Sequence, residues 1–546
     1  MRLARMGSFH PTRLSFARAL TRRMAREGWT VCRHRFDLDD TGTGTAIYRV
    51  ATPPQALWFV VFADHLDPAD RTDRVIAEKW DATFTLTEAE PEPETLDRLA
   101  IAVPRQEAGR CSEHELVLSR ANKSVRLFDH VVDRLAAGRQ PDRHRLLEVG
   151  YLVRTTAVYG NGKFGVADLD RVRQAGPLGL PFQAEMLCVY LARQFSLDWA
   201  EHIARRRAPA TFRPLDHDVA RGLGVGNATG LGMAPFLAGH PKLICRWIGM
   251  REAALARVRE IERCDQAVRE RFVELVNRAR AHVDQWPTSD ARQAGRIATL
   301  AHELDQLVSR APGPGEVRPW DRLFTGTSAC ASLETQEVLA SILIELYPEV
   351  SDGFDEEAGS REEMTLEPGA SPKTLRTLIE DRYGWALDID FSAPDATALF
   401  WYFSQEKSEP RIGHRNEEPG ADREMLVAVA RDVAALHRVL VETGDAHTTV
   451  ADFLLARPEW RGVVRRVQGL ASCPYAEIRE NLVDRGCRPV DLLRCKLAIL
   501  GATRFDPKSD LWTRVTLFQG APLAGELDRG DADDWAFASL PGHAGA

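Results

Sequence analysis

The spacing of apolar and polar residues predicts strands in the first hundred residues and mostly helices after them. Residues 12–27 place their apolar side chains at helical spacing. Short runs rich in β-branched and aromatic residues predict strands at 29–36, 45–50, 56–63 and 82–86. Two adjacent prolines between the second and third runs indicate a hairpin turn. The first part of the chain is therefore predicted to be a small α+β unit.

From about residue 111 onward the apolar residues recur with a period of 3.6, which predicts helices. They are expected at 119–137, 143–158, 180–206, 241–285, 290–310, 333–347, 372–383, 394–405, 421–442, 450–456, 474–484 and 489–500. The end of the second helix, T-T-A-V-Y, fits a strand equally well, and 513–518 is expected to be a strand. The predicted fold class is mainly α, with one or more multi-helix domains beside the N-terminal α+β unit.

Breaks in this pattern suggest the domain limits. The run A-P-G-P-G at 311–315 interrupts the helices, and 351–371 is rich in acids, glycine and proline. The predicted order is a small α+β unit (1–110), a helical domain with a long helical hairpin (111–312), a helical connector (313–350), an acidic flexible linker (351–371), a C-terminal helical domain (372–520) and a frayed tail (521–546). The helices within 241–310 are expected to brace a domain or to join two copies in a homo-oligomer.

Composition and charge indicate which partners are not expected and in which cellular compartment the protein is located. A net charge of −8 and a pI near 6.1 argue against a nucleic-acid partner. No apolar run approaches the roughly 18 residues that span a bilayer, so no membrane partner is expected. The nine cysteines form no C-x-x-C pair, which indicates reduced thiols and a cytoplasmic location. The arginine-rich first 26 residues superficially suit a transit peptide, but no cleavage site follows and an ordinary first helix is favoured.

Lysine is rare in this chain. Only 8 of the 71 basic residues are lysine. Where the composition favours arginine this strongly, a lysine that remains is a candidate for a position that needs a compact ammonium group.

Two glycine-rich stretches are predicted to be loops that form opposite walls of a small-molecule site. They are 154–165 (R-T-T-A-V-Y-G-N-G-K-F-G) and 222–235 (G-L-G-V-G-N-A-T-G-L-G-M-A-P). Glycine lets the backbone approach a ligand, and lysine supplies charge for a phosphate or carboxylate. The predicted substrate-binding residues in these stretches are Tyr159, Asn161, Lys163, Asn227 and Thr229. The structural alternatives are a tight turn with Lys163 in solvent and a glycine-rich turn where two helices meet closely.

Neither stretch is a known nucleotide-binding motif. A Walker A loop needs glycine where Ala157 stands and a hydroxyl residue where Phe164 stands. In the second stretch the glycine spacing is one residue too long for a dinucleotide fingerprint, and no strand is predicted before it. The cofactor is therefore unknown.

The densest polar stretch, 404–418, follows the aromatic run F-W-Y-F and is predicted to complete the site. Arg411 and Lys407 would bind the anionic group of the substrate, and Glu409 and His414 are candidates for proton transfer. Lys407, Glu409 and His414 are thus the predicted catalytic residues. The alternative is a solvated run of charges.

No metal site is predicted. Asp64, His65 and Asp67 are explained as a polar turn, and the triplet Asp216-His217-Asp218 has no further ligand at a suitable spacing.

Together these features favour an enzyme that acts on a small anionic metabolite, with its reaction type open. The first alternative is a non-catalytic helical scaffold or regulatory protein, and the second is a flavin- or nicotinamide-dependent oxidoreductase with a non-Rossmann cofactor site. The favoured hypothesis requires 159–165, 222–235 and 404–418 to share one positively charged cavity.

Overall fold

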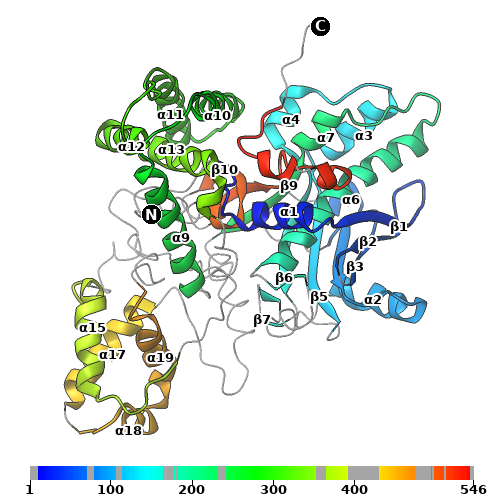
Figure 1. Cartoon of the computed structure of the whole chain (residues 1–546). Helices are drawn as coiled ribbons and strands as arrows, with labels where there is room; N and C mark the ends of the chain where they lie inside the picture. The colour runs from blue at the N-terminus through cyan, green and yellow to red at the C-terminus, as the bar shows by residue number, and fades with distance from the viewer. Residues whose placement is uncertain are drawn as a thin grey trace. The chain divides into compact units, whose positions relative to one another are not determined.

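The computed structural model divides the chain into two compact units (Figure 1). The sheet unit comprises Arg5–Thr229, Ala253–Gly359 and Leu497–Ala546, and the helical unit comprises Met1–Ala4, Gly230–Glu252 and Ser360–Lys496. The structure describes residues 10–53, 55–70, 79–105, 114–160, 162–163, 166–167, 177–179, 182–230, 241–351, 365–390, 429–444, 446–473, 494, 497–509, 512–529 and 531–540. Each unit combines distant parts of the chain, and in the sheet unit these parts contribute strands to one sheet.

A nine-stranded mixed sheet organises the sheet unit, in the order β1-β2-β3-β4-β5-β6-β9-β11-β10. The strands are β1 (Thr30–Leu38), β2 (Gly44–Ala51), β3 (Ala56–Ala63), β4 (Ala82–Thr87), β5 (Glu115–Lys123), β6 (Tyr151–Gly160), β9 (Gly224–Gly230), β10 (Ala502–Ser509) and β11 (Trp512–Leu517). Strands β1 to β6 form an antiparallel meander, and β10 and β11 form a C-terminal hairpin.

The prediction of a mainly α fold is wrong, because this sheet extends far beyond a small N-terminal unit. Strands β5 and β6 occupy segments predicted as helices (119–137 and 143–158), and β9 occupies a segment predicted as a loop. In β5 all but one residue are buried, so the strand lacks the polar–apolar alternation that marks a half-exposed strand. The helical period in these segments comes from the short helices α3 (Phe128–Ala136) and α4 (Arg143–Val149).

Two glycines of β9 are required by the packing of the sheet. A Cβ atom on Gly224 would overlap the carbonyl oxygen of Leu517 in β11, and one on Gly226 would lie 2.7 Å from ring atoms of Tyr151 in β6. The first half of the second glycine-rich stretch is therefore explained by the close approach of its neighbours in the sheet.

Helix α6 (Gln183–Arg207) lies at the centre of the sheet unit and is buried around most of its circumference. It packs against β4, β5 and β6 on one side and contacts α1 (Phe16–Arg26) and α3. Phe195 of α6 makes an edge-to-face contact with Phe84 of β4 at 6.0 Å between ring centroids. The α6 face of the sheet is therefore a closed, apolar layer in which any polar side chain needs a partner.

The other helices of the sheet unit are α2 (Pro93–Arg105), α7 (His217–Gly222), α10 (Gln266–Asp284), α11 (Ala291–Ser309), α12 (Pro319–Cys330) and α13 (Leu333–Leu346). The single helix predicted at 241–285 is two helices, α9 (Pro241–Glu260) and α10, because Asp265 caps the start of α10 by accepting a hydrogen bond from the Val268 amide at 2.8 Å. The predicted antiparallel partner of this segment is α11, which packs against α10.

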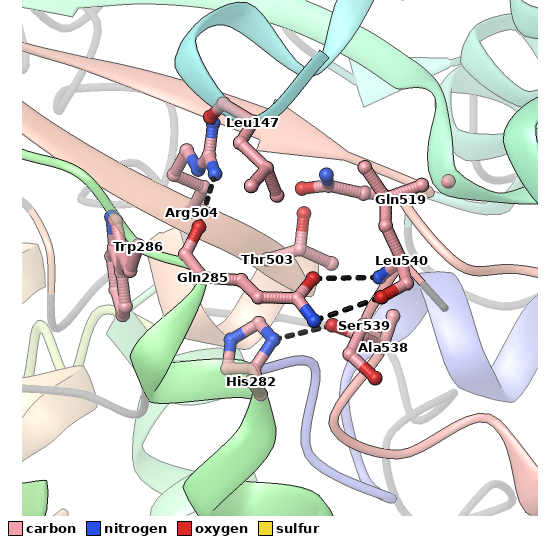
Figure 2. Close-up of a pocket in the computed structure, with 11 residues that line it drawn as sticks. Leu147, His282, Gln285, Trp286, Thr503, Arg504, Gln519, Ala538, Ser539 and Leu540 are labelled. Carbon is pink, nitrogen blue, oxygen red and sulfur yellow. Dashed lines mark hydrogen bonds between the residues drawn. The ribbon is translucent and has the colours of Figure 1, made fainter. Parts of the chain in front are cut away.

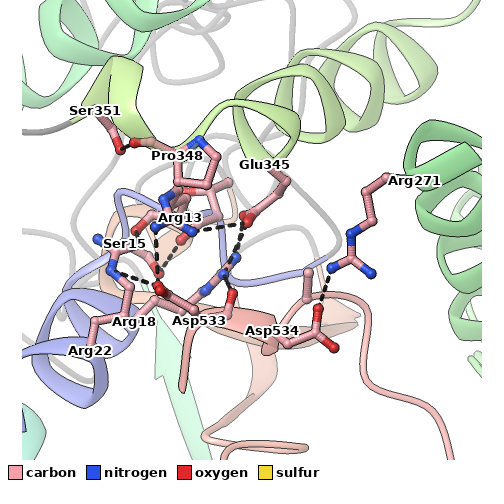
Figure 3. Close-up of polar contacts among 12 residues, drawn as sticks. Arg13, Ser15, Arg18, Arg22, Arg271, Glu345, Pro348, Ser351, Asp533 and Asp534 are labelled. Atoms are coloured by element: carbon pink, nitrogen blue, oxygen red, sulfur yellow. Dashed lines mark hydrogen bonds and ion pairs between the residues drawn. The ribbon is translucent and has the colours of Figure 1, made fainter. Parts of the chain in front are cut away.

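A buried ion pair and hydrogen bonds from arginines join α1, α13 and the C-terminal segment of the chain (Figure 3). Arg18, which is fully buried, pairs with Glu345 and donates a second bond to the carbonyl oxygen of Asp533 at 3.0 Å. Nearby, Arg13 donates to the carboxylate of Asp533 at 3.1 Å. Residues 521–529 and 531–540, suggested by the sequence to be a frayed tail, are thus held in place by side chains that lie hundreds of residues away in the sequence.

The described part of the helical unit contains α15 (Pro372–Leu387), α17 (Val429–Thr443), α18 (Val450–Ala456) and α19 (Arg461–Leu470), together with the start of α9. Apolar residues of the four C-terminal helices, among them Ile379, Leu436, Phe453 and Val467, form one core. The predicted helix 450–456 is confirmed, and a reciprocal capping box between Thr449 and Asp452 explains where it begins.

A carboxyl group in α17 gives this unit a predicted dependence on pH. Burial raises the pKa of Asp432 from 3.8 to about 6, so the folded state binds its proton more tightly than the unfolded state. The tighter binding of this proton stabilises the folded state below pH 4, and this stabilisation is lost as the pH rises through 6. We expect Asp432→Asn to raise the free energy of unfolding by about 1 kcal/mol at pH 8, because the buried negative charge is removed, and to have little effect at pH 4.

Thermal unfolding at the two pH values measures this effect, with the exposed Glu442→Gln on the same helix as the matched control. If Asp432→Asn stabilised the protein equally at both pH values, or if Glu442→Gln showed the same pH dependence, ionisation of Asp432 would not be the cause.

Candidate functional site

The two glycine-rich stretches lie side by side in the sheet. Strand β6 pairs with β9 in parallel, with Tyr151 opposite Gly224, Arg154 opposite Gly226 and Thr155 opposite Asn227. Because the strands run in the same direction, their carboxyl ends reach the same end of the sheet. In open parallel α/β sheets ligands bind outside the carboxyl ends of the strands, and the β6–β9 pair has this parallel geometry within a mixed sheet.

A short hairpin continues the first stretch beyond the end of β6. Strand β7 (Gly162–Lys163) pairs in antiparallel fashion with β8 (Val166–Ala167), and β8 contacts both β6 and α6. The backbone of Lys163 therefore belongs to a hairpin that lies beside β6 and α6.

A buried polar pair joins β6 to β9. The side-chain amide of Asn227 donates a hydrogen bond to the hydroxyl of Thr155 at 2.8 Å, and that hydroxyl lies 3.4 Å from the carbonyl oxygen of Gly226. Thr155 is fully buried and Asn227 is 8% exposed. Among the residues that the structure describes, Asn227 Oδ1 is a buried acceptor that receives no hydrogen bond. Such a group costs stability unless a ligand or water completes it.

A buried lysine lies on the same face of the sheet. Ala121 pairs with Thr155 across β5 and β6, and residue alternation puts Lys123 on that face too. The ammonium of Lys123 lies 4.1 Å from the ring centroid of Trp199 in α6 and 3.9 Å from Oδ1 of Asp81. The sequence reasoning missed this residue, although the rarity of lysine was a signal that could have marked it.

Two arginines lie on the opposite face of the sheet. Arg154 pairs with Asn122 across β5 and β6, and Arg120 lies two residues before Asn122 in β5. The guanidinium of Arg120 stacks on Trp80 at 3.9 Å, and Arg154 is only 3% exposed. The register of the strands therefore places both arginines on this face of the sheet.

The predicted site residues are only partly within the described structure. Asn227 is described in full, whereas for Tyr159, Lys163 and Thr229 only the strand backbone is described. Five predicted residues lie outside the described part of the chain: Asn161, Lys407, Glu409, Arg411 and His414. The first two segments of the predicted site are adjacent in the sheet, and the approach of 404–418 to them stays a prediction.

Two cavities lie elsewhere in the sheet unit, beside the C-terminal segment. The smaller one has room for about one water molecule, ≈ 20 Å³ (Figure 2). Its polar groups are engaged with the protein: Arg504 donates to the carbonyl oxygens of Leu147 and Gln285, and the side chain of Gln285 bonds the backbone of Leu540 at 2.7 and 2.8 Å. We interpret this cavity as a packing defect under the C-terminal segment.

The larger cavity, ≈ 220 Å³, is lined by charges that already pair with each other. Arg278 contacts the carboxylate of Asp534 at 3.0 Å and donates to its carbonyl oxygen at 2.7 Å. This geometry anchors the C-terminal segment to α10.

Within the described ranges, no group of three or more histidine, cysteine or acidic side chains is arranged to hold a metal ion. The triplet at 216–218 begins α7, where His217 contacts Glu526. None of the described helices is both long enough and apolar enough to cross a membrane. Comparison of the chain with protein-family models, curated proteins and solved structures finds no match.

Proposed function

We propose that this protein is a cytoplasmic enzyme that acts on a small anionic metabolite, carboxylated or phosphorylated, bound at the carboxyl ends of β6 and β9. The observation that supports this most directly is the parallel pairing of the two strands, which brings both glycine-rich stretches to one end of the sheet. The hairpin that carries Lys163 begins directly after β6 and contacts α6 through β8.

The amide of Asn227 suits a metabolite with hydrogen-bonding groups. As assigned, its oxygen accepts a bond from a hydroxyl or amino group of the ligand while its nitrogen bonds Thr155. If the amide is rotated, the Thr155 hydroxyl donates to the oxygen and the nitrogen becomes a donor for an anion. In both orientations one atom of a rigidly held, buried amide is available to the ligand.

In this proposal Lys163, Arg411 and Lys407 bind the anionic group of the metabolite. We assign proton transfer to Glu409 and His414, because carboxylate and imidazole side chains are common general acids and bases in enzymes. Tyr159, Asn161 and Thr229 complete the polar lining. The proposal includes no cofactor or metal and leaves the bond that is made or broken open.

The experiment is a thermal-shift comparison with inorganic phosphate, citrate and glucose 6-phosphate as probes. We expect at least one probe to raise the Tm of the wild-type protein, because a ligand that binds only the folded state stabilises it. Lys163→Met should abolish this rise, while its Tm without probe stays within a few degrees of wild type. The matched control is Lys373→Met, which removes an exposed lysine of α15 in the helical unit.

A probe-induced rise that survives in Lys163→Met would remove the first glycine-rich stretch from the proposal. If none of the three probes shifts the Tm of the wild-type protein, the proposed class of ligand is wrong.

A further inference from the structure

Two cysteines from distant parts of the sequence meet in the helical unit. Cys245 lies in the second turn of α9, and Cys473 follows the end of α19. Their side chains are hydrogen-bonded to each other. Both are present as thiols, so two sulfur atoms are in contact without a covalent bond.

The surroundings of the pair favour a negative charge on sulfur. Lys242 and Arg246 lie on α9 three residues before and one residue after Cys245, and both act electrostatically on Cys473. The hydroxyl of Ser472 also bonds this sulfur. A thiolate next to lysine and arginine is the reactive form of cysteine.

The hydrogen bond from Cys245, together with these cations and Ser472, lowers the pKa of Cys473 from 9.0 to about 6, although partial burial acts in the opposite direction. At pH 7 the thiolate is then the main form of this side chain. By contrast, burial raises the pKa of Cys188 in α6.

The two sulfurs differ in their access to solvent. Cys473 is half-buried, so a small oxidant can reach it, whereas Cys245 is 9% exposed and sheltered within the unit. An accessible thiolate beside a sheltered thiol is the arrangement in which a first oxidation product is captured by the second sulfur.

We propose that Cys473 and Cys245 form a peroxide-reactive site, with Cys473 as the attacking thiolate and Cys245 as the resolving thiol. The Cys473 thiolate attacks one oxygen of hydrogen peroxide, the O–O bond breaks, and the hydroxide that leaves is protonated to water. The sulfenic acid on Cys473 is then attacked by the sulfur of Cys245, and the S–O bond breaks. The sulfenic oxygen leaves with the Cys245 proton as the second water. Hydrogen peroxide is reduced by two electrons, and the two thiols are oxidised to a disulfide.

The test is treatment of the full-length protein with hydrogen peroxide, followed by intact-mass measurement and peptide mapping. We expect the wild-type protein to lose the mass of two hydrogen atoms and to yield a peptide that links 245 to 473. Cys473→Ser should not form this link. Cys245→Ser should stop at the sulfenic acid, which dimedone traps on Cys473. Cys330→Ser, which replaces an exposed cysteine of the sheet unit, is the matched control and should behave like wild type.

Alkylation by iodoacetamide supplies an independent measurement that does not depend on disulfide formation. At pH 7 Cys473 should react about threefold faster than Cys330, because thiolate is the main form of Cys473 and its lower basicity offsets only part of that gain. Equal alkylation rates at the two residues would overturn the proposal. So would peroxide treatment that adds two oxygen atoms to Cys473 without forming the link, or that leaves both thiols unchanged.

Discussion

Replacing Arg193 with alanine should lower the free energy of unfolding of the sheet unit by at least about 4 kcal/mol, a large loss for one substitution. Arg193 lies in α6 and is 2% exposed. Its guanidinium donates to the carbonyl oxygens of Leu223 at 2.6 Å, Arg221 at 3.0 Å, Ala521 at 3.0 Å, Pro522 at 3.2 Å and Ala220 at 3.4 Å. Alanine would leave five carbonyl groups without this donor in a region closed to water.

These carbonyl groups belong to the end of α7, the start of β9 and the segment after β11, so one side chain fixes three parts of the chain. Burial lowers the pKa of Arg193 from 12.5 to about 10, which keeps the group protonated throughout the neutral range. The effect of Arg193→Ala should therefore be nearly independent of pH between 6 and 8.

Urea unfolding followed by tryptophan fluorescence measures the loss. Arg193→Lys should recover only part of it, because one ammonium cannot reach five carbonyl groups. Arg206→Ala is the matched control: this arginine lies in the same helix but is exposed, and its ion pair with Asp40 should contribute less than about 1 kcal/mol. A loss below about 2 kcal/mol for Arg193→Ala would mean that water replaces the guanidinium.

The second large effect is expected for Lys123→Met in β5. This substitution should cost about 3–5 kcal/mol, because it leaves the Asp81 carboxylate buried without its cation. Asp81 is fully buried, and its Oδ2 accepts a bond from the Lys123 amide at 2.9 Å, so the carboxylate cannot turn to solvent. Loss of the ammonium also removes the contact with the ring of Trp199.

A double-mutant cycle separates the charge from the packing. Lys123→Met combined with Asp81→Asn should be more stable than Lys123→Met alone, since no unpaired charge remains. The exposed pair of Lys79 and Asp70, 2.7 Å apart, supplies the control, and Lys79→Met should change the free energy of unfolding by about 0.5 kcal/mol or less. If the double variant were no more stable than Lys123→Met, buried charge would not be the cause.

Both residues act on the strands that carry the proposed site. Arg193 fixes the start of β9, which leads to Asn227, and Lys123 lies on the face of the sheet that carries Thr155. The two variants should therefore weaken probe binding as well as folding, whereas Lys163→Met should weaken binding alone. This contrast distinguishes residues that build the site from residues that contact the ligand.

The local pattern was sufficient for elements whose neighbours in the sequence are also their neighbours in space. Strands β1 to β4 and β11, and helices such as α1, α11 and α18, lie close to the predicted ranges, because runs of β-branched and aromatic residues or a helical apolar period mark each of them locally. Strand β10 was missed: the segment 503–510 has charges and a proline, and β10 is the end strand of the sheet, where proline is tolerated.

The strands at the centre of the sheet could not be predicted in this way. Strand β5 and residues 151–155 of β6 are buried on both faces, and β9 is rich in glycine because neighbouring groups approach its backbone closely. The pairing of β6 with β9 joins segments separated by α6 and α7, and no residue in either strand specifies the other. Pairing over such a distance arises when the central strands β4, β5 and β6 are buried against α6.

The sequence by itself determined helices such as α1, α11 and α18, the first strands, the shortage of lysine and the two glycine-rich stretches, because each of these depends on side chains that are near each other in the chain. Tertiary structure alone decided that the glycine-rich stretches are parallel neighbours, that Lys123 is buried against Asp81 and Trp199, and that Cys245 meets Cys473. These contacts arise only when apolar surface from distant segments is buried together, and the polar groups enclosed with it must then find partners in three dimensions.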